Sequence, residues 1–382
     1  MYKPKHPLHW PNLLFLTLTP LAAIVGAAWY IPRFGVRPYE IAAFVIMFLA
    51  TGLSITAGYH RLFTHVSYKA NPFVRLFYLV FGACAMQNSA LNWCSDHRLH
   101  HKHTDTDADP YNAGQGFWWS HIGWIFYQSR QEKQLDNVGD LKRDPLVMWQ
   151  YHYDVPIALI VGFVLPTLIG GLMGRAFGMF LWAGLIRVVF VHHSTFFINS
   201  LAHMYGDQPY SRKDTSRDSW WLAVLTNGEG YHNFHHMFPS DYRNGIKWYQ
   251  WDPTKWLIWG LRNVGFTQKL HRVSPHLILK ARMEVEALEA EKQIQRLPVE
   301  MGSPWRTRVA AARARFEHDL SQWAITRTRY WDLKKTAWVN SEGAKHWKEK
   351  LATYESRLDE ARLHWRELVR GLENRIPAPT PQ

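Results

Sequence analysis

Eight histidines in three clusters are the residues of this sequence with the clearest chemical potential. Their spacing is HxxxxH once and HxxHH twice: His60 and His65; His97, His100 and His101; His232, His235 and His236. In an α-helix, residues three and four apart share one face, so each HxxHH cluster can turn its imidazoles toward one side. Imidazole is a ligand for iron, zinc and copper. Two such clusters facing each other can therefore enclose a pair of metal ions.

The number of histidines favours a dinuclear redox site over a zinc site. A structural zinc takes four ligands, usually including cysteine, and a catalytic zinc takes three from the protein. The chain has only two cysteines, Cys84 and Cys94, and no HExxH motif that would supply the base of a zinc hydrolase. We therefore expect two iron ions that work with dioxygen. The other histidines are expected to be ordinary surface or hydrogen-bonded residues: His103, His121, His152, His192 and His193.

Apolar runs place these clusters beside a membrane. The chain has 382 residues, of which 47% are hydrophobic and 20% charged. Four nearly uncharged runs are long enough to span a bilayer, at residues 12–30, 41–59, 155–174 and 177–200. Short connections join them into two hairpins, so both termini and the long segments lie on one side. We expect an all-α membrane protein whose membrane domain is 1–275, with a cap formed by 60–154 and 201–275.

The charge distribution predicts which side of the membrane holds the termini and the histidine clusters. The net charge is +13, and most lysines and arginines lie on the side of the termini. By the positive-inside rule, the active site and both termini are then cytoplasmic. Basic residues beside 20 tryptophans are typical of membrane-surface proteins, and we expect no nucleic-acid partner. The apolar segment 73–93 carries Arg75, so we expect an interfacial or buried helix there, which keeps all three clusters on one side.

Beyond the histidines, an ordered series of motifs resembles the membrane fatty acid desaturases of the stearoyl-CoA (Δ9) type. The series runs from the first span to about Phe266, and its stretches are 58–65 (GYHRLFTH), 96–102 (DHRLHHK), 107–111 (DADPY), 116–124 (GFWWSHIGW), 199–203 (NSLAH) and 228–236 (GEGYHNFHH). The resemblance implies four transmembrane helices and a cytosolic cap that holds two irons. It also implies a ninth ligand, His203, and a further contact from Asn199 through a water molecule.

Helix geometry then suggests how the ligands divide between the irons. In HxxHH the first and last histidines point together and the middle one points beside them. We expect one iron at His60, His65, His97, His101 and His235, and the other at His100, His203, His232, His236 and the Asn199 water. Carboxylates near the clusters are candidates to orient the imidazoles through their other ring nitrogen, the alternative being plain solvation. These are Asp96 and Glu229, together with Asp105, Asp107 and Asp109.

The resemblance implies an oxidoreductase of fatty acid biosynthesis that inserts a cis double bond, at the Δ9 position, into a long saturated acyl chain. Neither reacting carbon is acidic, so the di-iron centre and O2 have to remove the hydrogens without a separate acid or base residue. A narrow apolar tunnel would hold the chain. Its expected lining is Trp93, Trp118 and Trp119, each of which could also be ordinary core packing, with Gln87 and Asn88 in the head-group region.

Ser95 departs from the family pattern, since animal acyl-CoA desaturases typically carry an arginine at this position. Acyl-CoA remains the expected substrate, with acyl-carrier protein and phospholipid acyl chains as alternatives. Two cysteines are too few for an iron–sulfur cluster. Electrons are therefore expected from a separate ferredoxin-like or cytochrome-b5-like protein, which exposed basic residues could steer.

From about residue 276 the sequence is charged and has no apolar span. Apolar residues from Trp347 to Leu372 recur at spacings of four and three, which is a heptad pattern, and a similar pattern begins at Trp305 after a helix start at Gly302-Ser-Pro304. We expect a helical extension over 276–376, packed as a hairpin or through self-association with another subunit, and a disordered tail at 377–382. The resemblance does not cover this extension.

Two other functions remain open. A hydroxylase of the same histidine-box class shares the oxidant and differs only in the step after hydrogen abstraction. A membrane metal-binding or transport protein without catalysis would need ionisable residues threaded across the bilayer. The histidines of this chain instead lie at the ends of the spans and beyond them.

Overall fold

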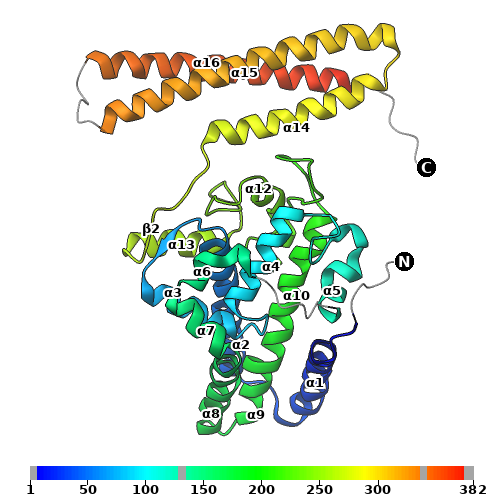
Figure 1. Cartoon of the computed structure of the whole chain (residues 1–382), viewed down its shortest axis with the longest axis vertical. Coiled ribbons are helices and arrows are strands. Elements are labelled where there is room, and N and C mark those ends of the chain that lie inside the picture. Colours follow the sequence, from blue (N-terminus) through cyan, green and yellow to red (C-terminus); the bar gives the residue numbers. More distant parts are fainter. Residues whose placement is uncertain (1–6, 128–134, 336–341, 374–382) are drawn as a thin grey trace. The chain divides into compact units, whose positions relative to one another are not determined.

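The computed structural model of the chain describes residues 7–127, 135–335 and 342–373. The tail predicted at 377–382 lies outside these residues. The chain divides into two compact units (Figure 1): Met1–Gln208 with Lys213–Arg272, and Pro209–Arg212 with Val273–Gln382. The boundary after Arg272 lies close to the one expected from the change in sequence texture at residue 276.

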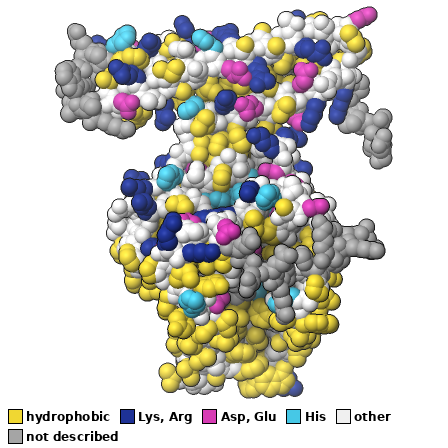
Figure 2. All heavy atoms as spheres, in the orientation of Figure 1, with side chains coloured by type: hydrophobic (Ala, Val, Ile, Leu, Met, Phe, Trp, Pro, Cys, Tyr) yellow, Lys and Arg dark blue, Asp and Glu magenta, His cyan; other side chains and the backbone are white. Residues whose placement is uncertain are grey.

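Four helical segments of the first unit are long and apolar enough to cross a membrane: Trp10–Phe34, Pro38–Thr64, Pro145–Leu172 and Ala176–His203. Each contains nearly all of one predicted run, and the second and fourth extend as far as the histidines at their ends. On the face that Figure 2 shows, the side chains of this region are mostly hydrophobic, as lipid-facing helices require. The prediction of an all-α membrane protein with four spanning helices is confirmed.

Wide π-helical turns interrupt three of the spans. The first span is the single helix α1 (Trp10–Phe34), and the second joins α2 (Pro38–Leu53) to a π-helical segment, Ser54–Thr64. The third is α7 (Pro145–Leu159), the π-helical turn Ile160–Val164 and α8 (Leu165–Leu172). The fourth is α9 (Ala176–Met179), the π-helical turn Phe180–Ile186, α10 (Arg187–Asn199) and a last 3₁₀ turn, Leu201–His203. Such turns are frequent at functional sites because they free backbone carbonyls and redirect side chains.

The apolar segment 73–93 forms two helices rather than the single helix expected from its sequence. Helix α3 (Pro72–Ala83) and helix α4 (Ala90–His103) are joined by a turn at residues 84–89. Met86 and Asn88 have positive φ angles of 56° and 72°, which a helix cannot contain, and Ser89 caps α4 by accepting from the Asn92 amide. The 12 residues of α3 rise only about 18 Å, too short to cross a hydrocarbon core of about 30 Å.

The core of the first unit lies where α3, α4 and α7 pack against the π-helical segment that carries His60. Tyr59, Tyr78, Leu79 and Leu91 are fully buried there. A Cβ at Gly58 would lie 2.6 Å from Cβ of Tyr78, so only glycine permits this close approach of α3. Short elements complete the unit: α5 (Trp124–Phe126), α6 (Gly139–Lys142), α11 (Trp220–Leu225), α12 (His232–Met237), α13 (Pro253–Asn263), and the antiparallel two-residue strands β1 (Lys69–Ala70) and β2 (Thr267–Gln268).

The second unit is built from three long helices, α14 (Pro275–Gln295), α15 (Val299–Lys335) and α16 (Glu342–Glu373). Helices α15 and α16 lie side by side as a hairpin (Figure 1), and α14 packs against both. The heptad residues Leu358, Ala361, Trp365 and Leu372 are buried in their common core. The helix start expected after Gly302-Ser-Pro304 is wrong: α15 begins at Val299, because the Pro298 carbonyl accepts the amides of Met301 and Gly302.

Candidate metal centre

Five histidines from three elements converge at one point. His60 and His65 close the second span, His97 and His101 lie one turn apart on α4, and His235 lies on α12. One ring nitrogen from each lies within 4.8 Å of all the others. Nε2 of His235 is 2.9 Å from Nε2 of His60 and 3.0 Å from Nε2 of His101. The imidazoles therefore direct their Nε2 atoms at a shared centre.

Four further histidines form a second cluster of the same kind. They are His100, His203, His232 and His236, from α4, the end of the fourth span and α12. Nε2 of His236 is 3.2 Å from Nε2 of His100 and 3.0 Å from Nε2 of His232. The rings of His101 and His236 stack with centroids 4.5 Å apart, so the two clusters adjoin. The clusters contain the same histidines as the division expected from helix geometry; that they bind metal stays a prediction.

Most of these imidazoles have a polar partner at Nδ1, the nitrogen that faces away from the centre. Glu229 Oε2 lies 3.0 Å from Nδ1 of His60, and both carboxylate oxygens of Asp109 lie 3.0 Å from Nδ1 of His100. Asp214 is 3.5 Å from Nδ1 of His236. A carboxylate that accepts the Nδ1 proton fixes the tautomer in which Nε2 carries a free lone pair.

Three of the orienting groups were not found from the sequence. The Tyr111 hydroxyl is 3.0 Å from Nδ1 of His97, and Thr215 Oγ1 is 2.9 Å from Nδ1 of His203 and donates to Asp105. Tyr111 ends the 107–111 motif, whereas Asp214 and Thr215 lie in a loop with no sequence signal of this role. Asp96, which was expected to help orient the histidines, is buried and lines a neighbouring cavity.

Burial favours the neutral form of most of these imidazoles. It lowers the pKa of six of them well below the ordinary value, and the neighbouring histidines add to this because each disfavours a charge on the others; the six are His65, His97, His101, His232, His235 and His236. Burial alone would raise the pKa of Glu229, but His60 and Arg61 lower it to about 2. The centre thus combines neutral nitrogen donors with a charged carboxylate behind them.

This donor set fits metal ions. Asp109 faces Nδ1 of His100 and Asp214 faces Nδ1 of His236, and the Nε2 atoms of the two rings lie 3.2 Å apart. In the tautomer with the proton on Nδ1, both Nε2 lone pairs are directed at the space between the rings, where a metal ion would accept them. Nε2 of His65 is buried and has no hydrogen-bond partner among the described residues, as expected for a donor atom that is free to coordinate a metal ion. Five and four nitrogen donors correspond to two adjacent metal ions rather than one.

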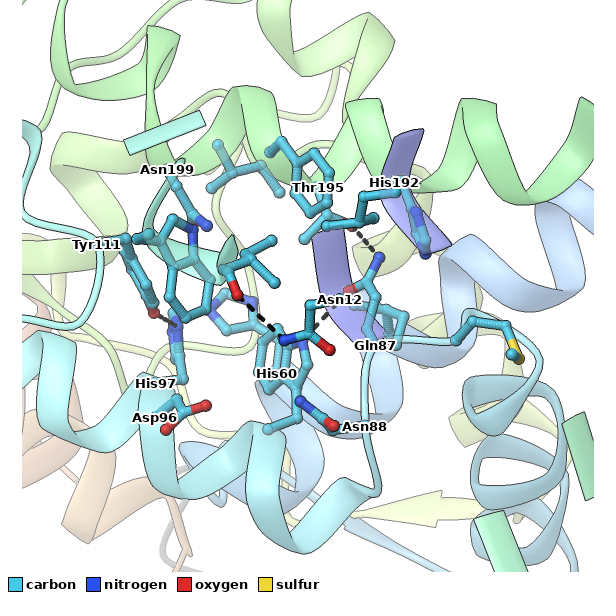
Figure 3. Close-up of a pocket in the computed structure, with 18 of the residues that line it drawn as sticks. Asn12, His60, Gln87, Asn88, Asp96, His97, Tyr111, His192, Thr195 and Asn199 are labelled. Carbon is cyan, nitrogen blue, oxygen red and sulfur yellow. Dashed lines mark hydrogen bonds between the residues drawn. The ribbon is translucent and has the colours of Figure 1, made fainter. Parts of the chain in front are cut away.

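A cavity opens against the five-histidine cluster (Figure 3). It encloses about 970 Å³, counting its open mouth, and His60, His97 and Asn199 line it together with Gln87, Asn88 and Trp93. The Trp93 ring stacks on His97 with centroids 5.0 Å apart, and its Nε1 donates to Gln87 at 3.3 Å. Gln87 in turn donates to Thr195 on α10 at 3.0 Å. The predicted residues Gln87, Asn88, Trp93 and Asn199 are therefore brought together beside the histidines.

Trp118 and Trp119 are not among the described residues that line this cavity. Trp118 is 75% exposed. The π-helical turn Trp119–Gly123 directs Ser120 and His121 inward instead, and His121 contacts His193 at 3.0 Å and Ser200 at 3.0 Å.

The fold and the site define a multi-pass helical membrane protein with two adjoining histidine clusters beside an apolar cavity. Residues 38–262, more than half of the chain, match the model of the fatty acid desaturase family. The chain therefore belongs to the fatty acid desaturase family, as the sequence motifs indicated.

Individual relatives agree with the family match. The chain is 41% identical over 291 residues to acyl-CoA desaturase 1 of Saccharomyces cerevisiae, covering 75% of this chain and 56% of the relative. It is 41% identical over 275 residues to the probable acyl-CoA desaturase of Schizosaccharomyces pombe, covering 72% and 57%. It is 35% identical over 252 residues to the sn-1 stearoyl-lipid 9-desaturase of Anabaena variabilis, covering 65% and 89%. The chain thus spans little more than half the length of the two yeast relatives.

Proposed function

We propose that this chain is an O2-dependent fatty acyl desaturase that introduces a cis double bond, at the Δ9 position, into a long saturated acyl chain. The observation that carries the proposal is the cavity that ends against the five-histidine cluster, where Trp93 stacks on His97. An alkyl chain in this cavity has its methylene groups next to nitrogen donors that are arranged for redox-active metal.

Two iron ions are the proposed cofactors. The first would be held by His60, His65, His97, His101 and His235, and the second by His100, His203, His232 and His236, with Asn199 acting through a water molecule. When bound, the irons supply the oxidising power that removes hydrogen from unactivated methylene groups with O2. Neutral imidazoles leave the metal charge largely uncompensated, which suits such a site better than the carboxylate and water ligands of magnesium or calcium.

The reaction balances without an acid or base side chain. Two C–H bonds of adjacent methylene groups break and one C=C bond forms, which releases two electrons and two protons. Two more electrons from an external donor and two protons from water complete the reduction of O2 to two water molecules. Since neither carbon is acidic, the residues of the cavity have only to bind, orient and desolvate the chain.

Side chains of the cavity are suited to these tasks. Phe15, Leu16, Ile55 and Phe196 give the wall an apolar character, and Ile198 extends it toward Asn199. The hydrogen bonds from Trp93 to Gln87 and from Gln87 to Thr195 fix the wall nearest to the histidines. A chain pressed against a fixed wall presents one C–C bond to the metal site, which is what regiospecific oxidation requires.

The proposed substrate is long-chain acyl-CoA, with the active site and both termini on the cytoplasmic side. The names of the yeast relatives support the carrier, and the excess of basic residues supports the orientation. The Anabaena relative is named for a stearoyl lipid, so a phospholipid acyl chain is the principal alternative, ahead of acyl-carrier protein. Electrons would come from a separate ferredoxin-like or cytochrome-b5-like protein. Residues 1–275 would form the desaturase domain and 276–376 an extension.

The test is mass spectrometry of total fatty acids from a host that is fed deuterated stearate and expresses the chain. The wild type should yield a deuterated monoene whose fragmentation gives the bond position. His236→Ala removes a proposed ligand and should abolish this product, whereas His103→Ala, outside both clusters, should retain it. A deuterated hydroxy acid would move the assignment to a hydroxylase. Iron in the purified wild type but not in His236→Ala, without either product, would favour a non-catalytic metal-binding protein.

A further inference from the structure

Arg187 is a fully buried cation inside the fourth span. It lies eleven residues after the start of that span at Ala176, or about 16 Å along it. Its hydrogen-bond partners among the described residues are three backbone carbonyls, Ala183 at 3.0 Å, Gly162 at 3.1 Å and Cys84, and its guanidinium also lies over the Phe163 ring, 5.7 Å from the centroid. A charge in a membrane interior is unfavourable enough that it normally marks a function, and no carboxylate in the described part of the chain forms an ion pair with this one.

The three carbonyls belong to three different elements. Ala183 lies in the π-helical turn of the fourth span and Gly162 in the π-helical turn of the third, where widened backbone leaves carbonyls free to accept. Cys84 ends α3, where the helix dipole is negative and unpaired carbonyls attract a cation. Gly162 has no side chain, and a Cβ there would lie 3.0 Å from the Arg187 guanidinium. One side chain thus ties α3 to both spans.

The turn that begins at Cys84 is held by two more side chains of α10. His192 Nε2 donates to the Ala85 carbonyl at 2.8 Å, and Thr195 accepts from Gln87 at 3.0 Å. Helix α10 therefore contacts three of the four residues from 84 to 87. Met86 and Asn88 have the positive φ angles that non-glycine residues rarely adopt. Such backbone persists only where the surroundings hold it.

This turn is also a wall of the cavity. Met86, Gln87 and Asn88 line it, and Trp93 lies on α4 one turn before His97. Figure 3 shows Gln87 and Asn88 on one side of the cavity, with Thr195 and His192 of α10 beside them. A shift of the turn therefore moves the surface on which an acyl chain would rest, whereas the histidines are held by other partners.

We propose that Arg187 and His192 are positioning residues that lock the 84–88 turn, and so set which carbon pair of the acyl chain lies beside the histidine clusters. This inference rests on the proposed desaturase function. Arg187 is not among the described residues that line the cavity, whereas His192 lines it and also holds the turn. They act through the backbone of the turn, which Arg187 holds at its first residue and His192 at its second.

The first test needs no activity and uses the two cysteines of the full-length protein in detergent. Cys84 and Cys94 are both fully buried, but only Cys84 lies on the turn. Arg187→Gln should raise the rate of maleimide labelling at Cys84 by about tenfold or more, the factor expected when charge-assisted hydrogen bonds are lost. Labelling of Cys94 should not change, and Arg187→Lys should be intermediate. Equal increases at both cysteines, or no increase at Cys84, would overturn the inference.

The second test reads the products. Arg187→Gln leaves the residues that line the cavity unchanged and should spread the double bond over neighbouring positions, or shift the ratio of C16 to C18 products by about threefold or more, per amount of folded protein. His192→Phe should act in the same direction, although it also changes the lining itself. Arg175→Gln is the matched control. Arg175 also links two spans by donating to backbone carbonyls, those of Phe34 and Gly35, but it lies away from the turn. A wild-type product pattern in the Arg187 and His192 variants would overturn the inference. A wild type without any monoene would refute the proposed function, while Cys84 labelling still decides whether Arg187 locks the turn.

Discussion

Glu229 Oε2 lies 3.0 Å from Nδ1 of His60, while Glu229 Oε1 accepts from the Arg61 guanidinium at 2.8 Å. Arg61 also contacts Asp252, and Asn244 donates to Glu229, so all of these side chains are buried and linked by hydrogen bonds. The network thus joins His60 of the HxxxxH cluster to Glu229, which lies three residues before the last HxxHH cluster. The His60 imidazole of the five-histidine cluster is thereby oriented by the segment that leads into α12.

Glu229→Gln should lower iron content by weakening the hold on His60. Loss of an orienting carboxylate typically reduces metal affinity about 10–100-fold. Among the described residues, the buried Arg61 would keep Asp252 as its only ionic partner, beside the Tyr242 carbonyl, so the melting temperature in detergent should also fall, by an amount that corresponds to roughly 3 kcal/mol. Iron per protein and thermal unfolding are the measurements. The exposed Glu300→Gln is the control, and an unchanged iron content in Glu229→Gln would contradict the assignment.

Asp109→Ala should affect the four-histidine cluster, because Asp109 is the partner of His100 Nδ1. We expect the protein to retain closer to one iron than two after dialysis, given the about 10–100-fold loss of affinity that such partners usually account for. The exposed Asp107→Ala, two residues away, should retain the wild-type iron content. Equal iron in both variants would show that Asp109 does not support a ligand.

Acid should destabilise the metal-free protein at a pH set by histidine. Folding lowers the pKa of the buried imidazoles below their unfolded value near 6.5. The unfolded chain therefore binds more protons as the pH falls through 6.5, and the stability present above that pH is lost. Each group contributes at most about 1.4 kcal/mol per pH unit. The chelator-treated protein should melt at a lower temperature at pH 5.5 than at pH 7.5.

Glu229 contributes to acid destabilisation in a lower pH range than the histidines. Its pKa in the folded protein is about 2, so the stability that its carboxylate provides is lost only below about pH 4.5. Iron should oppose the loss between pH 7.5 and 5.5, because metal binding requires the neutral imidazole. A melting temperature of the metal-free protein that rises toward pH 5.5 would contradict the burial of neutral histidines.

Trp93→Ala should change the product pattern, whereas Trp118→Ala should not. Trp93 lines the cavity and stacks on His97, but Trp118 is an exposed side chain outside it. Trp93 is partly buried, so its removal is expected to destabilise the protein by up to about 3–5 kcal/mol, and products are compared per amount of folded protein. The measurement is the chain length and bond position of the monoenes. If the monoene pattern changed in Trp118→Ala but not in Trp93→Ala, the acyl chain would not bind in the cavity lined by Trp93.

Trp365→Ala should unfold the three-helix unit in part. Trp365 is 1% exposed in its core, and its Nε1 donates to Glu286 on α14 at 2.7 Å. The truncation should reduce the stability of that unit by about 3–5 kcal/mol. Limited proteolysis of the full-length protein should then cut within residues 273–373 sooner than in the wild type. Leu363→Ala, which changes a 58% exposed residue on the same helix, should leave the cutting rate unchanged.

The spans and the grouping of the histidines within each HxxHH could be predicted from the sequence because both depend on local periodicity, whereas His203 was included only through the resemblance to the desaturases. A run of about 20 apolar residues has one stable arrangement in a bilayer, and residues three and four apart on a helix must share a face. The heptad pattern from Trp347 to Leu372 likewise predicted a packed helix, and its inward positions are buried.

Only the tertiary structure determined which groups contact the Nδ1 atoms of the clustered histidines, and which residues line the cavity. Asp214 and Thr215 reach His236 and His203 from a loop, and no local pattern shows which loop residue folds back onto a ligand. The break at residues 84–89 also escaped prediction, since its apolar residues read as a helix. Its positive φ angles are stabilised by Arg187 and His192, about a hundred residues away. Local sequence determines which residues share a helix face, but the packing of distant segments determines which residues contact that face.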